Sequence, residues 1–94
     1  RFFVAYEDAH GLNTAFGYYS GLYVSTGTSN TFIGAKAGQG ITGTRLEGNF
    51  NTAIGESAGL KLQGAATSNT FIGYAAGDTI TTGSDNIGIG RVFL

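Results

Sequence analysis

Short segments of alternating polar and apolar residues recur along the chain, each starting at an asparagine and closing at a glycine. They are Asn13-Thr-Ala-Phe-Gly17, Asn30-Thr-Phe-Ile-Gly34, Asn51-Thr-Ala-Ile-Gly55, Asn69-Thr-Phe-Ile-Gly73 and Asn86-Ile-Gly-Ile-Gly90. The steps from one asparagine to the next are 17, 21, 18 and 17 residues. The chain is therefore a repeat with a period of 17 residues, lengthened by four residues in the second unit and by one in the third.

This repeat predicts strands. A unit of 17 residues is too short for a pair of helices, and each glycine would destabilise a helix by about 1 kcal/mol relative to alanine. The Thr-Phe-Ile and Thr-Ala-Ile segments alternate with period 2 and are rich in β-branched and aromatic residues, as strands are. We expect an all-β fold, a β-solenoid of the parallel β-helix or β-roll kind, whose coils stack at about 4.8 Å.

The predicted solenoid covers residues 13–90. Its coils are 13–29, 30–50, 51–68 and 69–85, with a partial coil at 86–90. Residues 1–12 are expected to form an N-terminal cap or edge segment, and residues 91–94 a C-terminal edge segment. Open ends of a solenoid are sheet edges that other structures normally cover. We therefore expect the chain to continue, to form a trimer, or to stack end to end.

Alternation within the strands predicts which residues form the core. The column that carries isoleucine never becomes polar, and a second apolar column follows it at a constant offset of eight residues. The predicted core columns are Phe16, Ile33, Ile54, Ile72 and Ile89, and Val24, Ile41, Leu62 and Ile80. The extra residues of the second unit should follow Ile41, in an exposed loop at 44–50.

The opposite face of the strands is predicted to carry an amide ladder and a packing surface. Stacked asparagines form such ladders along a coil axis, here Asn13, Asn30, Asn51, Asn69 and Asn86. Between them, alanine and phenylalanine alternate. An exposed apolar patch calls for a partner. The expected subunit-packing residues are Phe32 and Phe71, with Phe2, Phe3, Phe93 and Leu94 at the two ends.

Composition excludes several function classes. Charged residues make up 12% of the chain, the formal net charge is −1, and there are no cysteines and one histidine. These values argue against a disulfide framework, a thiolate nucleophile, a zinc finger, and a basic surface for nucleic acid or anionic membranes. No apolar run approaches the roughly 20 residues of a membrane span. We expect no cofactor and no metal site.

Individual motifs favour structural roles over chemistry. Gly38-Gln-Gly-Ile-Thr-Gly43 matches a dinucleotide-binding pattern, but its glycines are turn glycines of the repeat and no helix is expected after it. His10 is best explained as an N-terminal loop or cap residue. The carboxylates Glu47, Glu56, Asp78 and Asp85 are expected to be solvated turn residues, because nothing pairs them across a cleft. The chain is not expected to be an enzyme.

The units at 30–38, 51–59 and 69–77, together with Thr81-Thr-Gly-Ser84, resemble repeats of phage tail-fibre and tail-fibre-like proteins. They are also similar to the Ser-Val-Ala-Ile-Gly repeats in the heads of trimeric autotransporter adhesins. The resemblance covers residues 13–90 and implies a homotrimeric fibre, extracellular or on a virion surface, that contacts a cell-surface glycan or protein. No chaperone segment of the kind found in many tail fibres is present.

Three functions stay open at this point. The leading one is a structural module of a tail-fibre or adhesin-like fibre that supports cell attachment. The second is a filament subunit joined end to end through its apolar termini. The third is a monomeric ice-binding solenoid, which requires the column Thr14, Thr31, Thr52 and Thr70 to point outward. For the exposed tyrosines, including Tyr18 and Tyr74, packing between subunits is favoured over stacking on sugars.

Overall fold

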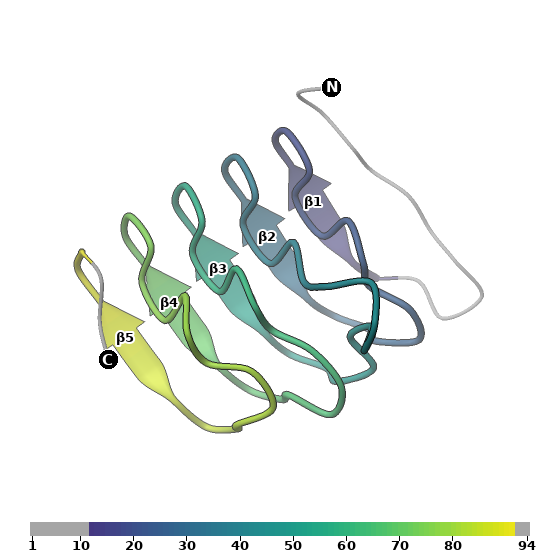
Figure 1. The fold of residues 1–94 in the computed structure, drawn as a ribbon. Coiled ribbons are helices and arrows are strands. Elements are labelled where there is room, and N and C mark those ends of the chain that lie inside the picture. Colours follow the sequence, from purple (N-terminus) through teal and green to yellow (C-terminus); the bar gives the residue numbers. More distant parts are fainter. Residues whose placement is uncertain (1–11, 92–94) are drawn as a thin grey trace.

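The computed structural model describes residues 12–91. They contain five parallel strands: β1 (Thr14–Phe16), β2 (Thr31–Ile33), β3 (Thr52–Ile54), β4 (Thr70–Ile72) and β5 (Ile87–Ile89). The strands follow chain order in one sheet, and the chain returns through loops between them (Figure 1). The prediction of a β-solenoid is confirmed. The predicted cap at 1–12, apart from Leu12, and Phe2, Phe3, Phe93 and Leu94 lie outside the described residues.

Equivalent residues of neighbouring coils pair in strict register. Thr14 pairs with Thr31, Thr31 with Thr52, and Thr52 with Thr70, and the same holds for the other strand positions. Backbone hydrogen bonds extend this register beyond the strands, as from the Thr14 N–H to the Asn30 carbonyl at 2.8 Å. Extra residues are accommodated in the loops, so the steps of 17, 21 and 18 residues all lead back to the same register.

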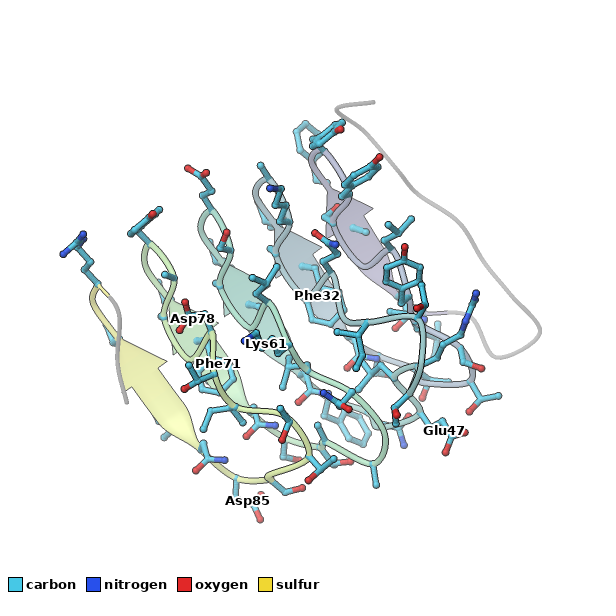
Figure 2. The ribbon with its side chains drawn as sticks, viewed as in Figure 1. Phe32, Glu47, Lys61, Phe71, Asp78 and Asp85 are labelled. Carbon is cyan, nitrogen blue, oxygen red and sulfur yellow. The ribbon has the colours of Figure 1, made fainter. Side chains whose placement is uncertain are left out.

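The two faces of the strands are the reverse of the prediction. The middle residue of each strand points inward, and Phe32 and Phe71 are each only 1% exposed (Figure 2). The predicted core column instead faces outward, with exposed side chains at Phe16, Ile33, Ile72 and Ile89 and a half-buried one at Ile54. Phe32 and Phe71 are therefore core residues, and their assignment to subunit packing was wrong.

A narrow interior explains the reversal. The ring of Phe32 lies so close to Gly38 that a methyl group there would overlap it, and Phe71 lies in the same way against Gly77. Phenylalanine alternates with Ala15 and Ala53 in the neighbouring coils, so each ring stands beside a small residue. Large and small residues thus fill the interior at close packing, whereas a bulky residue in every coil would overpack it.

The second core column differs from the prediction in one coil. Val24 and Leu62 are buried, and Ile80 packs against the core, as expected. In the long second coil, however, Leu46 is fully buried and forms bridges to Val24 and Gly64, whereas Ile41 is exposed. The exposed insertion therefore comprises residues 41–45 and precedes the core residue. The predicted loop at 44–50 was placed too late in the chain.

Each coil also contains two non-glycine residues in the left-handed region of backbone conformation. One lies directly before the asparagine that starts each repeat segment: Leu12, Ser29, Phe50, Ser68 and Asp85, with φ between 58° and 66°. The other lies two residues after the glycine that closes the strand: Tyr19, Lys36, Ser57 and Ala75. Side chains disfavour this region by roughly 1–2 kcal/mol, so the corners of the coils hold backbone strain.

Phe71→Ala should lower the free energy of unfolding by about 3–5 kcal/mol, because it leaves a cavity in the narrow core. The measurement is denaturant-induced unfolding followed by circular dichroism. Phe50→Ala is the matched control, because Phe50 is 62% exposed, and its effect should stay within about 0.5 kcal/mol. Equal losses for both variants would contradict the assignment of Phe71 to the interior.

Ser68→Gly should raise the free energy of unfolding by about 1 kcal/mol, because glycine adopts a φ of 60° without a steric penalty. Ser25→Gly is the control, since Ser25 does not have a positive φ and should instead lose about 0.5–1 kcal/mol. Thermal unfolding of both variants beside the parent chain tests the pair. A loss of stability in Ser68→Gly would show that the corner is not strained.

Candidate functional site

A continuous ladder of asparagine side chains runs through the inside of the solenoid. Each Nδ2 donates a hydrogen bond to Oδ1 of the asparagine in the preceding coil, at 3.1, 2.9, 2.9 and 3.0 Å from Asn30 to Asn86. The backbone N–H of the same residue donates to the same oxygen, at 2.9, 2.9, 3.1 and 3.0 Å. Every Oδ1 from Asn13 to Asn69 therefore accepts two hydrogen bonds from the following coil.

The second Nδ2 proton of each of four asparagines forms a hydrogen bond across the interior of its own coil. It is donated to a loop carbonyl, from Asn13 to Gly27 at 2.8 Å and from Asn51 to Ala66 at 2.9 Å. Asn30 and Asn69 donate in the same way, to Gly48 and Gly83. Asn30, Asn51 and Asn69 are fully buried. The predicted ladder is present, but it lies on the inner face, where it fixes both the coil spacing and the width of each coil.

A second polar row, which sequence analysis missed, joins the loops two residues before each asparagine. The Thr28 N–H donates to Asn49 Oδ1 at 2.8 Å, the Asn49 N–H to Thr67 Oγ1 at 3.4 Å, and the Thr67 N–H to Ser84 Oγ at 3.2 Å. The sequence carries a signal for it, since this register holds a hydroxyl or amide residue before each of the last four ladder asparagines. This row joins the loops of neighbouring coils by hydrogen bonds, as the asparagine ladder joins the strands.

The outward side of the sheet carries a regular surface of threonine and isoleucine side chains. We name it the Thr–Ile face: Thr14, Phe16, Thr31, Ile33, Thr52, Ile54, Thr70, Ile72, Ile87 and Ile89. None of these side chains is charged. Ile33 and Ile72 are nearly two-fifths exposed even within the stack, at 39% and 38%. A threonine column over β1–β4 and an isoleucine column over β2–β5 thus lie side by side in strict register.

The candidate carboxylates among the described residues lie apart from one another. Glu47, Asp78 and Asp85 extend from different loops (Figure 2), and the described residues contain no group of three His, Cys, Asp or Glu side chains that could hold a metal ion. His10 lies outside the described residues. Gly38 and Gly40 are turn residues with positive φ, and no helix follows them, so the local structure that a dinucleotide site requires is missing at 38–43.

Tyrosine side chains make local contacts at the edges of the coils. The rings of Tyr18 and Tyr19 stack with centroids 4.1 Å apart. Their hydrogen bond, chiefly, raises the pKa of Tyr18 above its ordinary value of 10.0. The Arg45 guanidinium lies 5.6 Å from the centre of the Tyr23 ring. These contacts do not join into a continuous aromatic surface along the solenoid.

Comparisons with known proteins add no relative: no family model, curated protein or solved structure matches the chain. Among the described residues there is no helix of the length and apolar character needed to cross a membrane. The two regular features of the described residues are thus the internal asparagine ladder and the uncharged Thr–Ile face.

Asn51→Leu should lower the free energy of unfolding by about 3 kcal/mol or more. It removes all four side-chain hydrogen bonds of Asn51 and leaves the Ala66 carbonyl, the Asn69 N–H and one Asn69 Nδ2 proton unpaired, at about 1–3 kcal/mol each. Asn30 Oδ1 keeps one hydrogen bond, from the backbone N–H of residue 51. Asn86→Leu, which loses one such bond, is the control and should cost about 1 kcal/mol. Chemical unfolding measures both, and similar values would argue against the ladder as the main constraint.

Proposed function

We propose that this chain is a non-enzymatic structural module of a fibre, extracellular or on a virion surface, that supports attachment to a cell surface. The observation that carries the proposal is the exposed isoleucine column on the Thr–Ile face. A rigid apolar surface of this extent, free of charge, favours cover by another protein surface. A second copy of the same chain offers a surface with identical spacing.

Side-by-side packing through this face replaces the packing that the sequence predicted. Phe32 and Phe71 are buried within the coil, so they are not available to a partner. The Thr–Ile face has one row of side chains per coil, and rows about 4.8 Å apart on two copies interdigitate when their axes run parallel. Three copies around an axis would bury all three faces, in keeping with the homotrimers of the families that the repeat resembles.

The architecture also suits a fibre along its axis. Each coil makes the same hydrogen bonds to the next, and the stability of such a stack grows by roughly the same increment per coil. Length can therefore change by whole coils without any change in cross-section. A spacer or shaft needs this property, whereas a catalytic site does not.

A second candidate function is supported by the orientation of threonine. Thr14, Thr31, Thr52 and Thr70 lie in one outward column with isoleucine beside it. A flat, uncharged surface with regularly spaced hydroxyl and methyl groups can order water in an ice-like arrangement. Ice binding requires the Thr–Ile face to be exposed to water. The fibre proposal requires the same face to be covered by another subunit.

Light scattering coupled to size-exclusion chromatography tests the fibre proposal. We expect an oligomer, with a mass three times 9.7 kDa for a trimer, and its dissociation in the double variant Ile33→Asp, Ile72→Asp. Ile41→Asp is the control, because Ile41 is equally exposed but lies outside the Thr–Ile face, and it should leave the mass unchanged. A monomer of 9.7 kDa for the parent chain would contradict the proposal. Thermal hysteresis of that monomer, lost in Thr31→Tyr, would support ice binding instead.

A further inference from the structure

The Thr–Ile face has a ridge along one side and a groove along the other. In β2, β3 and β4 the third residue is isoleucine and the first is threonine, which has the smaller side chain. Ile33 and Ile72 are exposed, whereas Thr31 and Thr70 in the same strands are half-buried. The groove ends at β5, where Ile87 takes the place of threonine. A surface that covers this face must therefore offer a groove to the ridge and a ridge to the groove.

A second copy offers both, but only when the two solenoids run in the same direction. Rotation of a copy about an axis parallel to the solenoid reverses its strands, so the isoleucine ridge of each copy lies over the threonine groove of the other. Rotation about an axis along the strands reverses the order of the coils instead, and ridge then meets ridge. Two ridges in contact hold the faces apart and leave voids over the grooves, which lose the contacts of close packing. In a ring of three copies around an axis parallel to the solenoid, the ridge side of each copy likewise adjoins the groove side of the next.

Charged residues at the two edges of the face favour the same direction. Asp85 comes directly before the asparagine of the last coil and Arg91 directly after its closing glycine, so they lie at opposite edges of one coil, and both are exposed. The Arg91 guanidinium lies 5.5 Å from the centre of the Tyr74 ring. Solenoids that run in the same direction bring Asp85 to the edge that holds the partner's Arg91. In the opposite direction Glu56, at the Arg91 edge of the middle coil, would face the partner's Glu56, and like charges repel.

We propose that copies of this chain pack through the Thr–Ile face with their solenoids running in the same direction and with equal coils at the same height. The isoleucine ridge of each copy then fills the threonine groove of its neighbour, and Asp85 pairs with the neighbour's Arg91. The inference rests on the proposed function as a fibre module. It adds the polarity and the axial register of the partner, which that proposal leaves open.

Distances between spin labels, measured by pulsed electron paramagnetic resonance, test the polarity on the full chain, which has no cysteine of its own. Tyr19→Cys and Ser57→Cys place a label at the same corner position of the first and third coils. We expect the same distance between the labels of neighbouring copies for both variants, because equal coils lie at the same height. In the opposite direction only the labels of the Ser57→Cys chain would stay level, and those of the Tyr19→Cys chain would be four coils apart, about 19 Å along the axis.

The outcomes separate this inference from the proposal on which it rests. A longer distance for the Tyr19→Cys chain than for the Ser57→Cys chain would overturn the inference and leave the fibre proposal standing. A monomer of 9.7 kDa without any distance between labels would overturn both.

A double-mutant cycle on the dissociation constant, measured by sedimentation equilibrium, tests the axial register. Asp85→Asn and Arg91→Gln should each weaken association by up to about fivefold per contact, as expected for an exposed ion pair. The double variant should be no weaker than either single variant, because both substitutions remove the same pair. Asp78→Asn makes the same change of charge away from both edges of the face and should leave the constant unchanged. Effects of Asp85→Asn and Arg91→Gln that add in the double variant would overturn the inference.

Discussion

A buried asparagine is tolerated only when all of its hydrogen-bonding groups are paired, and this constraint organises the whole solenoid. Asn30, Asn51 and Asn69 are fully buried, and each side chain bonds to the coil before it, the coil after it and the far side of its own coil. An unpaired amide in this position would cost several kcal/mol. A slip of one residue would break every one of these bonds, so the ladder specifies the register more strictly than the apolar residues do.

The outward face follows from the same constraint. Side chains alternate along a strand, so an inward asparagine turns the next residue outward, the one after it inward, and the isoleucine outward again. The apolar column is thus exposed because the polar one is buried. This inversion leaves a single chain with a regular apolar surface, which is the physical basis of the function proposed above.

The sequence predicted the repeat, the all-β solenoid and the stacking of asparagine. It failed on the faces because the isoleucine column looked like a core by hydrophobicity alone, while the ladder's full set of partners, Gly27 and Ala66 among them, lies far away in sequence. Leu46 was missed because both Ile41 and Leu46 are apolar, and only the loop geometry chooses between them. The strained corner positions, such as Phe50 and Tyr19, hold neither glycine nor asparagine, so their residue types did not indicate a positive φ.

Hydrogen exchange of the side-chain amides, followed by NMR, tests whether the asparagine ladder lies inside the coil. We expect the Nδ2 protons of Asn51 and Asn69 to exchange as slowly as the backbone amides of β3 and β4, because both protons of each side chain are hydrogen bonded inside the coil. The side-chain amide of Gln63, which bonds only to the exposed Lys61 carbonyl, serves as the fast reference. Exchange of the asparagine amides at the rate of the Gln63 amide would place them on the outside of the coil and contradict the buried ladder.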